Sequence, residues 1–372
     1  MPILEIAALL RNGTVDCTTI VQTFINRLEE FDPYLAIVSS PLYDRALETA
    51  ASHQALLDSG TDTGPLMCIP FGVKDHHQIF DDDITSYGHI LYRNNVQSTK
   101  STLMQKLLEA GAIPIAKMVL GTFAWGSTHS HGQCMSPYLN GPGSGSSCGS
   151  ASGAALGALP FAISEETSGS IAGPAYANLI SGHIGSYGTI SRTGASLLCS
   201  ETDHLGFHSR YLSDYGAIFN YVRTGADPMD GDSLSIPYVN PADVDLTSLR
   251  VMLIDGAGQW VYNEEDDDWD WEGDIPQSRG KSGWHWDIRS QRIKDRLDAA
   301  GVQYDTFTLD QAGALWSFNE STPYFNCASP SIGVMMAGGP WAKAQDFEYA
   351  FQNSKWSGKS YRTNIYRLLL IA

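Results

Sequence analysis

Residues 67–76 read MCIPFGVKDH, an apolar run that passes into a lysine and an aspartate. The run from Met67 to Val73 predicts a buried strand, because it is short, apolar and preceded by the breaker Gly64-Pro65. A helix expected at about 98–110 leads into a second apolar strand at 112–116, AIPIA. Helices and strands that alternate in this way predict an α/β protein whose helices cover a largely parallel sheet.

Earlier and later segments follow the same pattern. Apolar residues recur at helical spacing after Asp16, an expected N-cap, and again over about 43–57. Residues 141–153, GPGSGSSCGSASG, are almost entirely Gly and Ser. We expect this stretch to be a loop at the mouth of a small-residue helix at 154–162, where backbone can wrap a reacting group.

The C-terminal part predicts another α/β unit. It has a strand at 250–254, a helix at about 286–300 and a strand near Val302. The acidic run 263–274, NEEDDDWDWEGD, is expected to be an exposed insertion. Because no repeat or linker composition divides the chain, one domain over residues 1–372 is expected.

Composition excludes several classes of protein. The 372 residues are 43% hydrophobic and 17% charged, which is enough apolar material for a large core. A formal net charge of -18 argues against nucleic acid as a partner, since phosphate binding needs a basic face. The six cysteines lack CxxC pairing, so we expect free thiols and no zinc site.

The N-terminus predicts a short amphipathic helix and no signal peptide. Its residues MPILEIAALLRNG lack a basic start and a long apolar run. No segment of the sequence approaches the roughly 18 apolar residues of a membrane span. A cytoplasmic location is therefore the default expectation, with a processed secreted form left open, and the oligomeric state is unknown.

Three stretches combine amine and hydroxyl groups: IPFGVKDH at 69–76, GSGSSCGS at 143–150 and EETSGSIAGPA at 165–175. In order and spacing they resemble the G-V-K-D, G-G-S-S-G-G-S and D-T-G-G-S-I-R-x-P-A motifs of the amidase signature family. The flanking stretches EAGAIPIAKM and GSYGTISRTG agree with the family, and the resemblance covers about residues 4–225. It places the family's lysine on Lys74, its first motif serine on Ser146 and its nucleophile on Ser170.

The resemblance implies a mechanism for these three residues. A serine hydroxyl is a poor nucleophile until a base takes its proton. Lys74 would be that base, uncharged because burial among apolar residues lowers the pKa of an amine. Ser146 would shuttle the proton from Ser170 to Lys74. The resemblance also implies that the peptide bond between Gly145 and Ser146 is cis. The resemblance also assigns the oxyanion donors to backbone N–H groups of Ser170 and of Thr167, Ser168 and Gly169.

The family resemblance further implies a three-layer α/β/α sandwich around a large mixed, mainly parallel twisted sheet. The expected reaction is cleavage of a carboxylic amide through an acyl-Ser170 intermediate, on a small-molecule amide or ester, without a cofactor or metal. For the substrate pocket we hypothesise Thr122, Trp125, His129 and Tyr187.

The chain departs from the family beside the nucleophile and at its end. Glu166 stands where the family has Asp, and Ala172 where it has Arg, so Glu166 must pair elsewhere or face water. Ser168 replaces a glycine. The last residues, RLLLIA, resemble the beginning of a strand that family members continue. We therefore expect a compact variant or an incomplete chain.

Other functions remain open from the sequence. The same triad would serve an acyl transferase or esterase, because both reactions pass through the same covalent intermediate. The departures also suit a non-catalytic, amidase-like binding protein. A metallohydrolase could use the pairs His76-His77 and His129-x-His131 with Asp75 or Asp82, although HExxH is absent.

Overall fold

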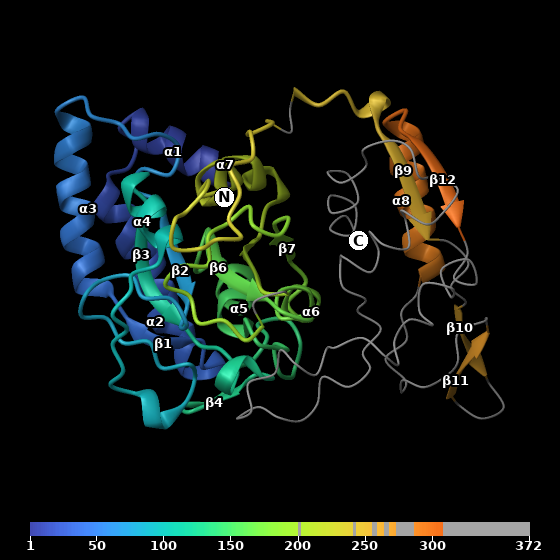
Figure 1. The fold of residues 1–372 in the computed structure, drawn as a ribbon, viewed down its shortest axis with the longest axis horizontal. Coiled ribbons are helices and arrows are strands. Elements are labelled where there is room, and N and C mark those ends of the chain that lie inside the picture. Colours follow the sequence, from blue (N-terminus) through green and yellow to red (C-terminus); the bar gives the residue numbers. More distant parts are fainter. Residues whose placement is uncertain (200–201, 241–242, 255–258, 264–267, 273–285, 308–372) are drawn as a thin grey trace. The chain divides into compact units, whose positions relative to one another are not determined.

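The computed structural model describes residues 1–199, 202–240, 243–254, 259–263, 268–272 and 286–307 (Figure 1). By its contacts the chain divides into two compact units, Met1–Tyr238 and Val239–Ala372. We describe each unit by itself, and the single domain expected over residues 1–372 stays a prediction.

The first unit is built on a six-stranded sheet with the order β1-β3-β2-β6-β8-β7. The pairs β3–β2 and β2–β6 are parallel, and the outer pairs are antiparallel. The sheet is therefore mixed, with a parallel centre, as expected. Its strands are β1 (Val38–Pro41), β2 (Pro70–Lys74), β3 (Ile113–Met118), β6 (Phe161–Glu166), β7 (Ser181–Ile184) and β8 (His204–Ser209).

The centre of this sheet is the core of the unit. Every residue of β2 and β3 is buried, and so is every residue of β6 before Glu166. Phe71 stacks on Phe161 across the β2–β6 pair with ring centroids 5.1 Å apart. The apolar runs that predicted the first two strands therefore form central strands, because both faces of the parallel sheet are covered.

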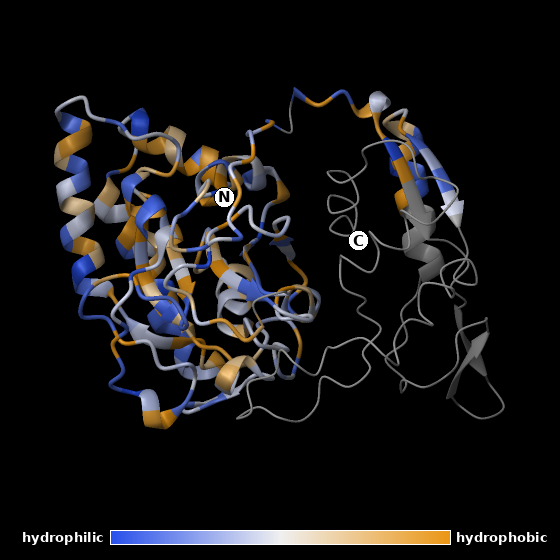
Figure 2. Cartoon of the chain, in the orientation of Figure 1, coloured by the Kyte–Doolittle hydropathy of each residue, from blue (hydrophilic) through white to orange (hydrophobic). Residues whose placement is uncertain are grey.

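Helices pack around this sheet, and α5 contacts β2, β6 and β8. Asp16 caps α2 by accepting from the Thr19 amide at 2.7 Å, as expected. Hydrophobic and hydrophilic residues alternate along α3, which matches a helix with one buried side (Figure 2). The helices of this unit are α1 (Ile3–Arg11), α2 (Cys17–Leu35), α3 (Tyr43–Asp58), α4 (Thr102–Glu109), α5 (Cys148–Leu156), α6 (Ala172–Ala177) and α7 (Tyr215–Val222).

The helix predicted at 154–162 is wrong in its bounds. Helix α5 starts inside the Gly/Ser run and ends at Gly157, whose φ of 75° leaves the helical region. The run forms a helix because only small residues fit there. A Cβ on Gly149 would lie 2.7 Å from the Ile37 carbonyl oxygen. Phe161 already belongs to β6.

Short elements complete the first unit: the 3-10 helices Ile90–Tyr92, Thr122–Ala124 and Leu212–Asp214, and the hairpin of β4 (Thr128–His129) and β5 (Gly132–Gln133). Within the residues that the structure describes, every helix is too short or too polar to cross a membrane.

The second unit contains the α/β elements predicted for it. Strand β9 (Arg250–Ile254) pairs in parallel with β12 (Gln303–Phe307), and α8 (Trp286–Ala299) lies between them in sequence. A 3-10 helix at Leu246–Ser248 precedes β9. Strand β10 (Gln259–Asn263) pairs antiparallel with β11 (Asp268–Glu272). Only 263 and 268–272 of the acidic run 263–274 are described, so its exposure stays a prediction.

The cysteines contradict the expectation of free thiols. Cys17 is bonded to Cys68 and Cys134 to Cys148, with Cα atoms 5.4 Å and 6.2 Å apart. Cys199 is also disulfide-bonded, whereas Cys327 lies outside the described residues. The sequence concealed these bonds because partners 51 and 14 residues apart form no spacing motif and meet only after folding.

Candidate active site

The structure brings Lys74, Ser146 and Ser170 into one line of hydrogen bonds. Lys74 Nζ lies 2.9 Å from Ser146 Oγ, and Ser146 Oγ lies 2.9 Å from Ser170 Oγ. Lys74 ends β2, and Ser170 follows the end of β6. The carboxyl ends of parallel neighbouring strands meet at the same edge of a sheet, so the topology places the amine beside the turn of Ser170.

Backbone contacts hold Ser146 in this line. The Gly145–Ser146 peptide bond is cis, as the family resemblance implies. Gly145 lies so close to Gly126 that an added Cβ would be 1.8 Å from the Gly126 carbonyl oxygen. The Ser146 carbonyl accepts from the Gly121 amide at 3.1 Å. The loop can therefore approach its neighbour only because glycine occupies position 145.

Lys74 has no exposed surface. Burial lowers the pKa of its amine, and the nearby carboxylate of Glu165 opposes that shift. An ammonium has three N–H donors, yet among the described residues Nζ contacts only Ser146 Oγ and, at 3.3 Å, Glu165 Oε2. An uncharged amine therefore fits this environment better than an ammonium does.

Sequence reasoning missed Glu165, and it considered His76 only as a possible metal ligand. Glu165 is 1% exposed, and its Oε2 contacts Lys74 Nζ and lies 2.9 Å from His76 Nε2. The His76 ring is neutral at pH 7, because burial lowers its pKa well below the usual value. The doubled Glu165-Glu166 was visible in the sequence, but nothing there showed which carboxylate faces the lysine.

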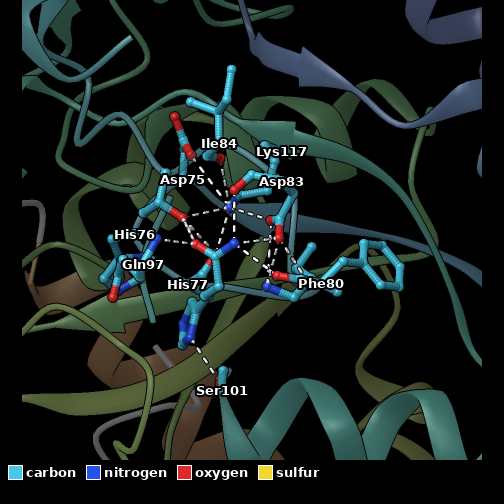
Figure 3. A network of polar contacts seen from close by, with 12 residues as sticks. Asp75, His76, His77, Phe80, Asp83, Ile84, Gln97, Ser101 and Lys117 are labelled. Carbon is cyan, nitrogen blue, oxygen red and sulfur yellow. Dashed lines mark hydrogen bonds and ion pairs between the residues drawn. The ribbon is translucent and has the colours of Figure 1, made fainter. Parts of the chain in front are cut away.

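A second buried lysine anchors the segment that follows Lys74 (Figure 3). Lys117 Nζ donates to the His77 carbonyl at 2.5 Å and to Asp83 Oδ2 and the Ile84 carbonyl, each at 3.0 Å. Asp75 Oδ1 lies 3.5 Å from the same nitrogen. These contacts fix the chain leaving β2 and therefore hold the end of the strand that carries Lys74.

The Glu166 carboxylate caps the turn that carries Ser170. It accepts from the Ala172 amide at 3.1 Å and from the amides of Gly169 and Ile171. Glu166 therefore pairs with backbone where the family has an arginine. Burial nonetheless raises the pKa of Glu166 to about 7.

The four hypothesised pocket residues have different surroundings. Trp125 is 51% exposed and lies in the segment that contacts the Ser146 loop, and Thr122 Oγ1 donates to the Gly88 carbonyl at 3.0 Å. The His129 ring is buried, with Nε2 3.1 Å from the Ala36 carbonyl. Tyr187 donates to Asp232 at 2.8 Å. None of the four is hydrogen-bonded to the triad in the described part of the chain.

The histidine pairs are engaged elsewhere. His77 Nδ1 lies 3.2 Å from Ser101 Oγ, and Asp82 forms a surface ion pair with Arg45. Asp75 accepts from Ser39 and Ser86. Among the residues described, no group of three or more His, Cys, Asp or Glu side chains is placed to hold a metal ion.

Comparison with known sequences matches the model of the amidase family over residues 19–268. A glutamyl-tRNA(Gln) amidotransferase subunit from Endomicrobium trichonymphae is 30% identical over 223 residues, covering 58% of this chain and 45% of that protein. The protein of the same name from Prochlorococcus marinus (strain NATL2A) is 33% identical over 259 residues, covering 67% of this chain and 52% of that protein. The chain thus spans about half the length of the curated relatives it matches.

Solved structures share the fold. The native peptide amidase from Stenotrophomonas maltophilia superposes with a TM-score of 0.69 at 23% identity, covering 95% of this chain and 71% of that one. An amidase family protein from Bacillus anthracis str. Ames gives a TM-score of 0.68 at 22% identity, covering 100% of this chain and 72% of that one. At these identities the likeness concerns the fold alone.

Proposed function

The chain belongs to the amidase family, and on this basis we propose that it is a serine amidase that cleaves a carboxylic amide through an acyl-enzyme on Ser170. One observation carries the proposal: the unbroken line from Lys74 Nζ through Ser146 Oγ to Ser170 Oγ, with both links at 2.9 Å. A buried amine that hydrogen-bonds to a serine pair is what base-activated acyl transfer requires.

The proposed steps move protons along this line. Ser170 Oγ attacks the carbonyl carbon while its proton passes to Ser146 Oγ, and the Ser146 proton passes to Lys74 Nζ. The carbonyl electron pair moves onto the oxygen. When the tetrahedral intermediate collapses, the C–N bond breaks and the amine leaves with the proton returned through Ser146. Water then attacks the acyl carbon while its proton passes to Lys74 through Ser146. The ester C–O bond breaks, the proton returns to Ser170 Oγ, and the acid is released.

The oxyanion would bind to backbone amides of the Ser170 turn, as the family resemblance implies for residues 167–170. The Gly169 amide already donates to Glu166. We therefore assign the oxyanion donors to the amides of Thr167 and Ser170. No hydrogen bond from these two amides is found to any described residue. A donor of this kind contributes about 2.7–4 kcal/mol to transition-state stabilisation.

We propose a small-molecule amide or ester as the substrate, bound beside the segment of Thr122 and Trp125. Phe123 is 37% exposed in the same segment, and Gly121, which precedes Thr122, donates its amide to the Ser146 carbonyl. An exposed aromatic pair next to the proton shuttle suits an apolar part of the substrate. We leave His129 and Tyr187 out of this pocket, because the His129 ring contacts the Ala36 carbonyl and Tyr187 donates to Asp232.

A fluorophosphonate probe tests the proposed enzyme. The probe reacts with activated serines, so mass spectrometry should find it on Ser170, and labelling and amide hydrolysis should both vanish in Ser170→Ala. Ser168→Ala is the matched control, because it removes a neighbouring hydroxyl outside the proposed proton path. A folded protein that stays unlabelled at high probe concentration would support the non-catalytic binding protein instead.

Acyl transfer is the second candidate, since the curated relatives named above are amidotransferase subunits. Hydrolysis and transfer share the acyl-enzyme and differ in the nucleophile that removes the acyl group. Adding hydroxylamine during turnover separates them by the product ratio. A hydroxamate that dominates at low millimolar hydroxylamine supports transfer, whereas release of the free acid alone supports an amidase.

We also propose that the protein works in an oxidising compartment, in place of the cytoplasm expected from the sequence. The bonds Cys17–Cys68 and Cys134–Cys148 motivate this, because cytosolic thiols are normally kept reduced. Alkylating the protein directly from its native source, followed by peptide mapping, tests the proposal. Quantitative alkylation of these four cysteines without prior reduction would rule it out.

A further inference from the structure

The lysine amine contacts the carboxylate of Glu165 as well as the proposed proton shuttle. Glu165 Oε2 is 3.3 Å from Lys74 Nζ, while Ser146 Oγ is 2.9 Å from the same nitrogen. The carboxylate projects from β6 and the lysine from the end of β2, which pair in parallel. The amine is therefore held by a hydroxyl that gives up a proton and by a carboxylate.

Fold stability alone does not account for this pair. Glu165 Oε1 has no hydrogen-bond partner among the described residues, and His76 Nε2 approaches Oε2 without the alignment of a hydrogen bond. A buried ion pair seldom adds net stability, because desolvation offsets the attraction. Lys117, by contrast, is surrounded by carbonyl and carboxylate oxygens. A half-satisfied carboxylate beside a half-satisfied amine instead suits a pair whose charge changes during a reaction.

The groups facing Lys74 leave Glu165 as its direct counter-charge. Glu166 and Asp203 also act on Lys74, but neither forms an ion pair with it. The neighbouring histidines are neutral at pH 7: burial lowers the pKa of His208 to about 4 and those of His76 and His77 well below their usual value. Lys117 is occupied by Asp75 and Asp83.

We infer that Glu165 is a positioning residue for Lys74, which holds the amine against Ser146 and stabilises the ammonium that forms when Lys74 accepts the Ser146 proton. This inference rests on the proposed function. Burial raises the pKa of Glu165, but the adjacent Lys74 opposes that shift, and most strongly when the amine is charged. In the proposed step Glu165 gains and loses no bond: the proton leaves Ser146 Oγ, the N–H bond forms on Lys74, and the carboxylate supplies the charge that balances the ammonium. Its part resembles that of the aspartate behind the histidine of a Ser-His-Asp triad.

Removing this charge has two effects of opposite sense. A carboxylate within ion-pair distance favours the charged amine, so in Glu165→Gln the lysine stays neutral down to a lower pH. The acid limb of the profile of kcat/KM against pH should therefore shift downward by about 1 unit or more. The plateau should fall by about 10-fold or more, because the developing ammonium has lost its counter-charge.

The experiment measures the rate of probe labelling at Ser170 and kcat/KM, each against pH, in folded variants. Glu165→Thr is a second neutral variant, suited to a strand if the amide of Gln does not fit. Glu165→Asp keeps the charge and should keep the acid limb near that of the wild type. Asp203→Asn is the matched control: it removes a carboxyl that makes no ion pair with Lys74, and should shift the limb less.

The outcomes separate the two proposals. Downward shifts in both neutral variants, with the limb retained in Glu165→Asp, support the inference. An unmoved limb in folded Glu165→Gln and Glu165→Thr overturns it and shows a merely structural carboxylate, while labelling of Ser170 leaves the proposed function standing. If wild-type Ser170 is not labelled at any pH, the proposed function itself fails.

Discussion

Lys74 and Lys117 leave adjacent parallel strands with no exposed surface, yet only Lys117 is surrounded by acceptors. In the β2–β3 register Val73 pairs with Lys117 and Lys74 pairs with Met118, so the two lysines are offset by one residue along the strands. Lys117 Nζ has a carboxylate, a hydroxyl and two carbonyls within hydrogen-bonding distance. In the part of the chain that the structure describes, Lys74 Nζ has one hydroxyl and one carboxylate. The same residue type thus serves as an anchor in one strand and suits a base in the next.

Replacing Lys74 by arginine should separate charge from basicity. A guanidinium keeps its proton at any working pH, so Lys74→Arg places a permanent cation beside Glu165 that cannot accept a proton. We expect kcat/KM to fall by at least about 1,000-fold. Lys117→Met is the contrasting variant. It should lower the thermal midpoint by leaving Asp75 and Asp83 buried without a cation, at a cost of about 3–5 kcal/mol. Lys74→Arg activity within tenfold of the wild type would contradict the need for a neutral amine.

Removing the cap of the Ser170 turn should affect both stability and rate. Glu166→Ala leaves the amides of Gly169, Ile171 and Ala172 without their acceptor. We expect a loss of about 1–3 kcal/mol in the free energy of unfolding, together with a lower kcat. Glu166→Gln keeps one carbonyl acceptor and should be intermediate. Urea unfolding and initial rates measure the two effects, and an unchanged kcat in Glu166→Ala would show that the turn holds its shape without the carboxylate.

The disulfide next to Ser146 should stabilise the fold. Cys134 and Cys148 close a segment of 14 residues, and Cys148 lies two positions after Ser146. The double variant Cys134→Ala/Cys148→Ala should lose about 3 kcal/mol, because the open chain gains conformational entropy on unfolding. Calorimetry of the variant against the wild type, both without reductant, gives the difference. Equal thermal midpoints would show that the bond contributes nothing to stability.

A buried histidine in β7 should make stability depend on pH. His183 stacks on Phe207 and contacts Phe219, and burial lowers its pKa to about 4. A depressed pKa means that the folded state prefers the neutral ring. The contribution of the neutral His183 ring to the free energy of unfolding is therefore fully present above about pH 6.5 and is lost as the pH falls toward 4. We expect this loss to be on the order of 2 kcal/mol, because the ring keeps some exposure to solvent. In His183→Phe the thermal midpoint should fall less between pH 7 and pH 4 than it does in the wild type. A slope as steep as that of the wild type would assign the effect to other groups.

Much of the first unit could be predicted because its information is local. The apolar runs of β2 and β3 and the Asp16 cap predicted elements that the structure confirms. The short outer strands β1, β7 and β8 were missed, because four to six residues with few apolar neighbours give no clear period. The start of α5 was misplaced for a related reason: small residues lack helical periodicity, and close packing rather than propensity makes them a helix.

The sequence by itself determined the family and the α/β class, and the order and spacing of its motifs were enough to propose Lys74, Ser146 and Ser170 as the catalytic residues. Only the tertiary structure decided which carboxylate faces the lysine, what replaces the arginine partner of Glu166 and which cysteines join. Each of these depends on strand register and chain crossing, which bring together residues such as Lys74 and Glu165, 91 positions apart. Burial then sets the charge of the amine, and burial is a property of the folded chain.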